Sequence, residues 1–369
     1  MRIGIHSRSL LRSPRKGLGN YLHFLFEEMI RAGQKRQFFL YHHAGGAGDF
    51  PSDRVTGRTI SEFPWRFHGG EQFWLPLSAV RDRIDLLHCP ANTLPVIQPC
   101  PTVVTVHDMI LTMFDEGESR NELFYWRKVM PVALRKAARI ITVSEWSRRD
   151  VIRLLGVPEE KVRTIHSGVN PFFVPLPPES LAEARAKHGL PGNYLFVLGA
   201  SSPRKNIRRA VEAFIRMKRE GFDPKLVMTV SDAAFRTELE AMLESARIQG
   251  EVVFLPHVDD ETLRVAYGGA SLFLYPSLYE GFGFPVLEAM ACGTAVVVSD
   301  AAALPEVAGE AALYIHPTET ESLIEAVGRL CDDSRLRREL RLKGLQRASS
   351  FSWASAASKT LDVYEDCLG

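Results

Sequence analysis

The chain has 369 residues, 46% of them hydrophobic, and a formal net charge of +1. This length exceeds what one hydrophobic core usually organises, so two domains are expected, and the small net charge argues against nucleic acid as a partner. The five cysteines are scattered without a Cys-x-x-Cys pair, which argues against a zinc site and a disulfide framework and favours a reducing cytoplasm.

Short apolar strands alternate with amphipathic helices along the chain, which is typical of parallel α/β folds. The first half predicts strands at 3–6, 37–41, 86–89, 103–106, 140–143 and 162–165. A group of prolines, which predicts a linker, then follows at Pro171, Pro175, Pro177 and Pro178. A second series predicts strands at 194–198, 226–230, 252–255, 272–275, 295–298 and 312–315. The predicted domains are therefore 1–170 and 171–352.

The start of the chain and its apolar stretches predict neither a signal peptide nor a membrane span. The segment Met1–His6 resembles a strand and lacks a long apolar core, and later apolar stretches are interrupted by Gly, Pro and charges. We therefore expect a cytoplasmic protein.

The loop that follows the first strand does not have the pattern of a nicotinamide site. Such a site needs Gly-x-Gly-x-x-Gly directly after the strand, yet no glycine follows Ile5 until Gly17. The basic stretch from Arg12 to Asn20, with Gly17 and Gly19, instead predicts a loop that opens a helix near Asn20. Two interpretations remain, an ordinary loop or one that touches a phosphate or an acceptor.

A histidine ends one of the strands predicted in the first half. His107 and Asp108 follow Val106, at the edge of a parallel sheet where α/β proteins bind ligands. His107 could donate a hydrogen bond to a transferred sugar or to an acceptor, with Asp108 orienting its ring. The alternative is a structural histidine whose hydrogen bonds are satisfied within the protein.

Residues 120–139 combine cations with aromatic and aliphatic side chains. The cations are Arg120, Arg127, Lys128, Arg135, Lys136 and Arg139. This basic amphipathic pattern predicts either a solvated helix face over an aromatic core or peripheral contact with an anionic membrane.

Small residues and two cations follow the strand that is predicted to end at Leu198. Gly199 comes first, and Arg204 and Lys205 stand five and six residues later, where a helix is expected to start. Two cations there could bind one diphosphate through charge-assisted hydrogen bonds. The alternative is a pair of solvated residues at a helix start.

Two glutamates with seven residues between them enclose the most informative segment of the chain. Pro285 suits the first position of a short helix that ends near Gly293, with Glu280 before the helix and Glu288 in its first turn. Free N–H groups at a helix start bind phosphate, so Glu280 would face a hexose and Glu288 a ribose. The alternative is that both glutamates only interact favourably with the helix dipole. The candidate donor-binding residues between them are Gly281, Phe282, Gly283, Phe284, Pro285, Val286 and Leu287.

This segment resembles the signature of retaining glycosyltransferases of family 4, in which two glutamates flank seven residues. Ile141–Ser147, His166–Asn170 and Lys205–Asn206 also resemble that family, whereas Ala200 stands where it often has an arginine. The resemblance implies the GT-B fold, an α/β architecture of two Rossmann-like domains whose parallel sheets face an interdomain cleft. By analogy, the predicted final helix at 353–369 returns to the first domain.

The resemblance also implies an enzyme and its substrates. The first domain would bind the acceptor, aided by the loop of Gly17, Gly19 and Asn20, and the second would bind a nucleotide sugar. Arg204 and Lys205 would stabilise the leaving diphosphate, Glu280 would bind the donor sugar, and His107 would reach the sugar. The sequence contains no Asp-x-Asp triplet, which favours protein cations over a metal ion for this task.

Substrate identity stays open at this stage. Overall likeness to bacterial mannosyltransferases favours GDP-mannose, with a UDP-hexose second, and no other cofactor is expected. The acceptor would be a glycan or a lipid-linked glycan of polysaccharide or lipopolysaccharide assembly, on the inner face of the membrane. A nucleotide-sugar epimerase and a non-catalytic sugar-binding subunit are the remaining alternatives.

Overall fold

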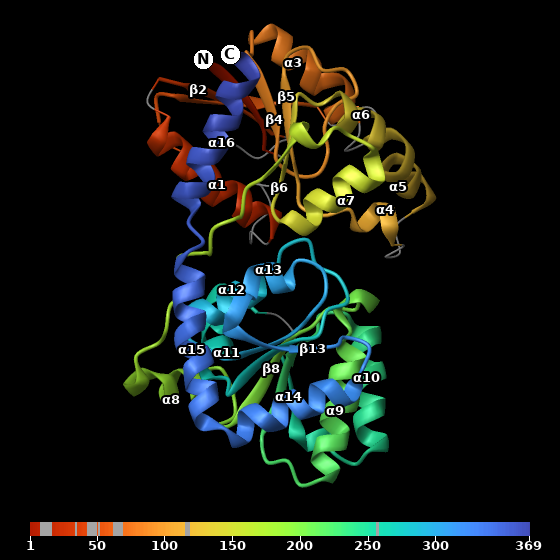
Figure 1. Cartoon of the computed structure of the whole chain (residues 1–369), viewed down its shortest axis with the longest axis vertical. Helices are drawn as coiled ribbons and strands as arrows, with labels where there is room; N and C mark the ends of the chain where they lie inside the picture. The colour runs from red at the N-terminus through yellow and green to blue at the C-terminus, as the bar shows by residue number, and fades with distance from the viewer. Residues whose placement is uncertain are drawn as a thin grey trace. The chain divides into compact units, whose positions relative to one another are not determined.

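The computed structural model describes residues 1–7, 17–33, 35–42, 50, 52–61, 69–114, 119–255 and 258–369. It divides the chain into two compact units. The first consists of Met1–Gly168 together with Phe351–Gly369, and the second of Val169–Ser350. Each unit is built on one parallel sheet with helices on its two faces (Figure 1).

The sheet of the first unit has seven strands in the order β3-β2-β1-β4-β5-β6-β7. The strands are β1 (Arg2–His6), β2 (Gln37–His42), β3 (Val55–Thr59), β4 (Leu86–Cys89), β5 (Thr102–Val106), β6 (Arg139–Thr142) and β7 (Val162–Thr164). The helices are α1 (Leu18–Ala32), η2 (Gly70–Trp74), α3 (Leu75–Arg81), α4 (Ile110–Met113), α5 (Arg120–Phe124), η3 (Tyr125–Val129), α6 (Met130–Lys136), α7 (Glu145–Leu155), η4 (Glu159–Lys161) and α16 (Trp353–Leu368).

The sheet of the second unit has six strands in the order β10-β9-β8-β11-β12-β13. The strands are β8 (Tyr194–Leu198), β9 (Lys225–Thr229), β10 (Val252–Leu255), β11 (Leu272–Tyr275), β12 (Val296–Ser299) and β13 (Ala312–Ile315). The helices are α8 (Pro178–Lys187), η5 (Pro203–Lys205), α9 (Ile207–Arg219), α10 (Ala233–Ser245), η6 (Gln249–Glu251), α11 (Asp260–Gly269), α12 (Phe284–Ala291), α13 (Leu304–Ala308), η7 (Gly309–Ala311), α14 (Thr320–Asp332) and α15 (Ser334–Ser349).

The strands of the second unit are apolar on both faces because helices cover both. Leu195 and Val197 of β8 pack in one core with residues of α9, α10 and α14. Tyr194 and Phe196 point the other way, into a core with residues of α11 and α12. This alternation explains why the strand sequence shows a continuous apolar run. The predicted α/β fold is confirmed.

One strand escaped the sequence prediction, namely β3 at Val55–Thr59. Among the described strands it lies at the edge of its sheet and pairs with β2 alone. Its five residues are half-buried or exposed, and only Val55 is a large apolar residue. An edge strand of this composition lacks the apolar run that reveals a central strand.

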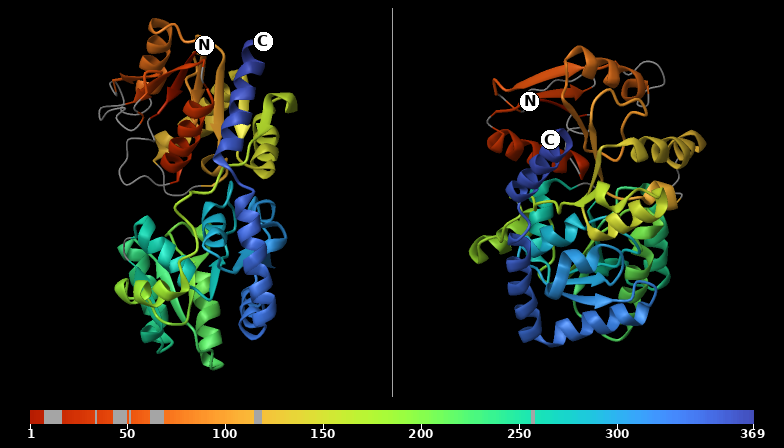
Figure 2. Two further views of the ribbon diagram at one scale, coloured as in Figure 1. Left: turned by 90° about the vertical axis from the view of Figure 1, so that its left-hand side faces the viewer. Right: turned by 45° about the horizontal axis from the view of Figure 1, so that its top comes forward.

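The C-terminal helix α16 packs on α1 of the first unit, and the two helices lie side by side in Figure 2. Ser352 caps its start by accepting a hydrogen bond from the N–H group of Ser355. Near its end, the hydroxyl of Tyr364 lies 2.5 Å from Nδ1 of His88, which is buried in β4. A buried side-chain hydrogen bond therefore connects the last helix to the sheet.

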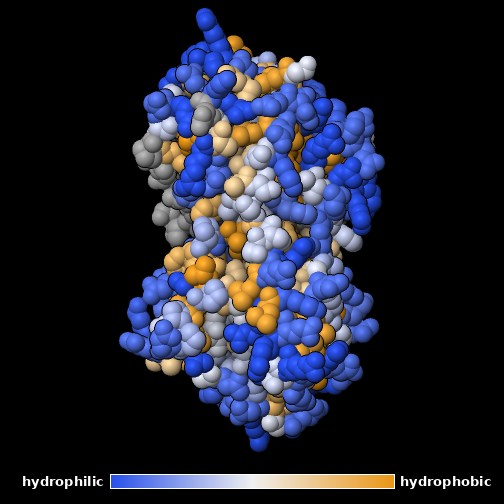
Figure 3. Space-filling view, turned by 60° about the vertical axis from the view of Figure 1, so that its left-hand side comes forward, coloured by the Kyte–Doolittle hydropathy of each residue, from blue (hydrophilic) through white to orange (hydrophobic). Residues whose placement is uncertain are grey.

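Hydrophobic residues on the face drawn in Figure 3 occur as separate groups among polar ones. Within the described ranges, no helix combines the length and the hydropathy that crossing a bilayer requires.

Candidate functional site

Two loops of the second unit bring Glu280 together with Arg204 and Lys205. One loop follows β8 and the other follows β11, and these two strands are parallel neighbours in the sheet. Their carboxyl ends therefore meet at the same edge, although the loops are about 75 residues apart in sequence. Lys205 Nζ donates to Glu280 Oε1 over 2.7 Å, and Arg204 Nη1 donates to Oε2 over 3.2 Å.

The carboxylate of Glu280 is buried, with 8% of the residue exposed. Burial raises the pKa of a carboxyl group, but the charges of Lys205 and Arg204 outweigh burial and hold the pKa of Glu280 below its ordinary value. Lys205 Nζ also donates to the hydroxyl of Tyr275, over 2.7 Å. With both cations and the carboxylate charged, the cluster carries one net positive charge.

Asn206 holds this cluster in place. Its backbone adopts a left-handed conformation with φ 58°, which asparagine tolerates better than most residues. Its side-chain amide donates to the carbonyls of Pro276, over 3.0 Å, and Pro317, over 2.6 Å. Leu278 N also donates to the carbonyl of Arg204, over 2.7 Å. The two loops are thus bonded to each other through their backbones.

Tyr275 is part of this cluster and was missed from the sequence. It is the last residue of β11, and Lys205 Nζ lies 5.0 Å from its ring centroid. Its position at the carboxyl end of a strand, five residues before Glu280, is the sequence feature that could have identified it. Since the hydroxyl of Tyr275 contacts Lys205, it helps to fix the position of the ammonium group.

The helix that follows Glu280 and contains Glu288 begins one residue earlier than predicted. Helix α12 spans Phe284–Ala291, with Gly283 as its N-cap at φ 119°, and Gly293 follows it at φ 77°. The N–H groups of Val286 and Leu287 both donate to the carbonyl of Gly283. The start of this helix therefore offers fewer free donors than the sequence predicted.

Glu288 consequently lies in the second turn of α12, and the predicted place in the first turn is wrong. Its Oε2 accepts a hydrogen bond from the hydroxyl of Tyr267 in α11, over 3.1 Å. Burial, with a smaller contribution from Asp260, raises the pKa of Glu288 to about 7, although the Tyr267 hydroxyl opposes this shift. Glu288 therefore keeps its proton to a higher pH than an ordinary glutamate does.

Most of the other residues between Glu280 and Glu288 are buried. The side chains of Val286 and Leu287 are fully buried, so only their backbone could face a ligand. Phe282 is buried and its ring contacts that of Phe284 at 5.0 Å, edge to face. Gly281 is buried in the loop before the helix, and Pro285 is half-buried within its first turn.

Gly199 has a packing role that the sequence did not predict. Its N–H group donates to Oγ1 of Thr229, over 3.0 Å, and a Cβ atom at this position would lie 2.4 Å from the carbonyl oxygen of Thr229. The glycine thus allows the loop after β8 to lie against the end of β9.

In the first unit, His107 follows β5 and is 6% exposed. Its Nε2 lies 2.9 Å from the carbonyl oxygen of Pro90, and its ring meets the edge of Tyr21 with centroids 4.5 Å apart. Asp108 was expected to orient this ring. Its carboxylate accepts a hydrogen bond from Ile110 N, over 3.0 Å, and the carbonyl of Pro90 holds the ring.

The glycine loop is described only in part, because residues 12–16 lie outside the described ranges. Gly17 is the N-cap of α1 with φ 44°, so the helix begins at Leu18, two residues before the predicted start. Gly19 is buried in the first turn of α1 and Asn20 is half-buried.

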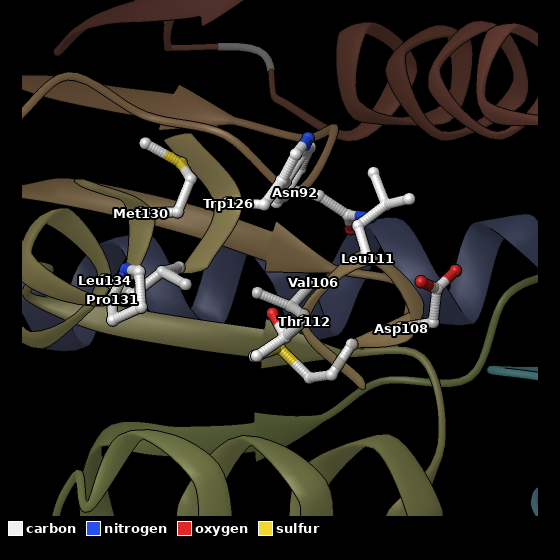
Figure 4. Close-up of a pocket in the computed structure, with 10 residues that line it drawn as sticks. Asn92, Val106, Asp108, Leu111, Thr112, Trp126, Met130, Pro131 and Leu134 are labelled. Carbon is white, nitrogen blue, oxygen red and sulfur yellow. The ribbon is translucent and has the colours of Figure 1, made fainter. Parts of the chain in front are cut away.

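A pocket of the first unit lies beside the end of β5 (Figure 4). Leu111, Trp126, Met130, Pro131 and Leu134 give it apolar walls, and Asn92 and Asp108 bring polar groups to it. Trp126 belongs to the basic segment at 120–139. Five of the six cations of this segment are exposed, Arg139 in β6 is half-buried, and Arg127, Arg135 and Lys136 donate to backbone carbonyls of the protein. These contacts fit a solvated face above a core.

Among the described residues, no three His, Cys, Asp or Glu side chains come together as a metal site would require.

Two family models match most of the chain. The family model described as "Glycosyl transferases group 1" matches residues 182–347, and the model described as "Glycosyltransferase Family 4" matches residues 15–173. O-antigen chain mannosyltransferase B of Escherichia coli is 28% identical over 374 residues, which cover 96% of this chain and 97% of that protein.

Two further matches differ in extent. The serotype-specific mannosyltransferase WbdA of Escherichia coli is 29% identical over 279 residues, or 73% of this chain, and the match spans only 34% of WbdA. The solved structure of Anabaena HepE in complex with UDP and glucose has a TM-score of 0.76 and 18% identity, and the match covers 99% of this chain and 100% of HepE. At this identity, the structural likeness establishes the fold alone.

Proposed function

Since the chain is a glycosyltransferase of the group 1 and family 4 type with the GT-B fold, we propose that it transfers mannose from GDP-mannose to a saccharide or a lipid-linked saccharide. The transfer retains the configuration of the anomeric carbon and serves the assembly of a cell-surface glycan. The two family models and the likeness to mannosyltransferase B confirm the family and the enzyme class predicted from the sequence. The donor, the acceptor and the retained configuration are proposed.

The observation that carries the proposal is the buried contact of Glu280 with Lys205 and Arg204. When a nucleotide sugar breaks, negative charge develops on the departing diphosphate. A cluster with one net positive charge, held by Asn206 and Tyr275 before the reaction, stabilises that charge without reorganisation. The departing phosphate accepts the proton of the acceptor hydroxyl, on the same face of the sugar as the new bond.

Glu280 then has two tasks in the proposed reaction. Its carboxylate keeps the two cations in position, and it accepts hydrogen bonds from hydroxyls of the donor sugar. Glu288 accepts hydrogen bonds from the ribose, and the backbone of Gly281 to Gly283 borders the diphosphate. The first unit binds the acceptor, with the loop at Gly17, Gly19 and Asn20 and the strand end at His107 as its contacts.

Mannose is proposed because mannosyltransferase B covers nearly the whole chain, at 28% identity. A UDP-hexose is the alternative donor. The proposed location is the cytoplasm, in agreement with five free cysteines, with peripheral contact at the inner face of the membrane where lipid-linked acceptors reside.

A paired screen tests the proposal. Calorimetric titration with GDP and UDP identifies the base, and each nucleotide sugar is then incubated with lipid-linked and free saccharides. We expect tighter binding of GDP and a mannosylated product with an α linkage. A product formed only from a UDP-hexose contradicts the donor, and an inverted linkage contradicts retention. Conversion of the nucleotide sugar without any acceptor indicates an epimerase, and binding without turnover indicates a non-catalytic subunit.

A further inference from the structure

Glu71 is a buried carboxyl group for which the proposed reaction has no use. It lies in η2, and only 1% of the residue is exposed. Its Oε1 accepts hydrogen bonds from the hydroxyl of Tyr125, over 2.6 Å, and from Nε2 of Gln72, over 3.2 Å. Its Oε2 accepts a hydrogen bond from the hydroxyl of Thr93, and Nδ1 of His6 lies 3.8 Å from the same oxygen. One carboxyl group therefore joins the start of η3 to the loop after β4.

Two π-helical turns meet at this carboxyl group. Glu71 belongs to η2 and Tyr125 opens η3, and π-helical turns are rare and occur frequently at functional sites. Gln72 adds two bonds to the loop after β4. Its Nε2 donates to the carbonyl of Leu94, over 3.1 Å, and its Oε1 accepts a hydrogen bond from Val96 N, over 2.9 Å. Glu71 and Gln72 thus fix that loop and the start of η3 relative to each other.

The residues next to these anchors line the pocket drawn in Figure 4. Trp126 follows Tyr125 and Asn92 precedes Thr93, and both side chains line this pocket. Trp126 is half-buried, so part of its indole ring is accessible. Oδ1 of Asn92 accepts a hydrogen bond from the N–H group of His107, over 2.6 Å. The side-chain N–H groups of Trp126 and Asn92 make no hydrogen bond within the described ranges and are available to a ligand.

The composition of the pocket fits a sugar ring. Its apolar walls include the Trp126 ring, whereas Asn92, Asp108 and Thr112 bring an amide, a carboxylate and a hydroxyl to it. A hexose presents C–H groups on its faces and hydroxyls around its edge, so an aromatic ring with polar groups beside it matches a hexose. An aliphatic lipid chain would displace water from these polar groups without replacing their hydrogen bonds, and the pocket disfavours it.

We propose that this pocket binds a sugar ring of the acceptor and that Glu71 is the positioning residue that keeps its two sides in place. Tyr125 transmits the effect of Glu71 to Trp126, and Thr93 transmits it to Asn92. The inference rests on the proposed function in that the ligand is the acceptor, and it deepens that function by naming a subsite. Loss of a bond to Glu71 is expected to weaken the acceptor alone, because the proposed donor residues belong to the second unit.

Steady-state kinetics of Tyr125→Phe test the positioning role. This variant keeps the aromatic ring and loses the hydroxyl that donates to Glu71. We expect KM for the acceptor to rise about tenfold, with kcat and KM for the donor little changed. Tyr314→Phe is the matched control, because it also loses a hydroxyl that donates to an oxygen of the protein, the carbonyl of Gly309, in the second unit. An unchanged acceptor KM in Tyr125→Phe, or equal rises of KM for acceptor and donor, overturns the positioning role.

Double variants distinguish positioning from a general loss of stability. Trp126→Ala removes one wall of the pocket, so adding Tyr125→Phe to it is expected to raise the acceptor KM no further. Thr93→Val removes the other bond to Glu71 and acts on the side of Asn92, so its effect is expected to persist in Trp126→Ala. If Tyr125→Phe raises the acceptor KM equally with and without Trp126, the proposed route from Glu71 to the pocket is overturned.

Binding to the pocket is also measured without turnover. NMR of the full chain follows the indole N–H signal of Trp126, assigned with Trp126→Phe, during titration with the methyl α-glycosides of mannose, glucose and galactose. We expect at least one hexoside to shift this signal, and to shift it less at equal concentration in Tyr125→Phe. No shift with any hexoside, or a shift with farnesol alone, overturns the sugar subsite. If no donor supports transfer, the proposed function fails, and this titration still decides whether the pocket binds a sugar.

Discussion

Lys205 Nζ lies 2.7 Å from Oε1 of Glu280, and the two residues come from loops that follow neighbouring strands. Arg204 bonds the other oxygen of the same carboxylate. The carboxylate of Glu280 neutralises one of the two positive charges of Arg204 and Lys205. The cluster therefore offers a phosphate one net positive charge, whereas two unpaired cations would offer two. The consequences for activity can be tested at each member of the cluster.

The first prediction concerns the ammonium group of Lys205. Lys205→Ala removes the nearer cation from Glu280 and from the leaving diphosphate. We expect turnover to fall by about two orders of magnitude, which corresponds to about 3 kcal/mol of lost stabilisation in the transition state. Steady-state kinetics with saturating donor measures it. Lys187→Ala is the matched control, because Lys187 is an exposed lysine of the same unit that also pairs with a glutamate, Glu261.

A structural role of Lys205 is separated from a catalytic one by a second substitution. In Lys205→Ala the carboxylate of Glu280 keeps only Arg204 as a cationic partner, so stability is expected to fall. Adding Glu280→Gln removes the buried charge and is expected to restore stability without restoring turnover. Recovery of turnover in the double variant would show that Lys205 serves only to neutralise Glu280.

The second prediction concerns metal ions. Protein cations are proposed to stabilise the leaving group, so transfer is expected to continue in excess EDTA at its original rate. The assay compares chelated enzyme with enzyme supplied with magnesium or manganese. Loss of activity that either ion restores would contradict the proposed role of Lys205 and Arg204.

The third prediction assigns the two glutamates to different parts of the donor. Glu280→Gln is expected to abolish most transfer while binding of the nucleotide diphosphate stays at least as tight, because the cluster then carries two net positive charges. Glu288→Gln is expected to weaken binding of the nucleotide diphosphate, since its carboxylate is proposed to meet the ribose. Calorimetric titration of both variants measures these affinities. The reverse pattern would exchange the two assignments.

The fourth prediction follows from the pKa of Glu288, which burial raises to about 7. The ionised form is the stronger acceptor for ribose hydroxyls, so nucleotide affinity is expected to rise about tenfold between pH 6 and pH 8. The contribution of Glu288 to the free energy of unfolding changes with pH in the opposite direction to the nucleotide affinity. Between the ordinary carboxyl pKa and 7, the folded state holds a proton that the unfolded state has lost, so stability declines as pH rises through this window. Both dependences are expected to vanish in Glu288→Gln, and an unchanged pH profile would exclude Glu288 as their source.

The fifth prediction concerns Gly199. Gly199→Ala places a Cβ atom 2.4 Å from the carbonyl oxygen of Thr229, so the loop after β8 has to shift. We expect a loss of about 1–3 kcal/mol in the free energy of unfolding, measured with urea. Gly192→Ala is the control, because a Cβ atom there meets nothing within 4 Å. Equal stability of the two variants would contradict the packing role.

The sequence alone determined the α/β class, the central strands and the residues at their carboxyl ends. Central strands such as β8 and β11 are buried on both faces, so their apolar runs are readable without a structure. Cations and carboxylates that follow such strands necessarily lie at one edge of a sheet. The candidate residues Arg204, Lys205 and Glu280 could therefore be named from the sequence.

Only the tertiary structure decided how these groups meet. The contact of Lys205 with Glu280 depends on β8 pairing with β11, although β9 and β10 lie between them in sequence. Glu288 lies in the second turn and not in the predicted first turn, because the helix starts at Phe284. No local sequence pattern resolves this difference of one residue. The ring of His107 is held by the carbonyl of Pro90, which follows a different strand. Each of these features depends on a contact or boundary at the scale of single atoms, whereas sequence patterns report which face of an element is buried.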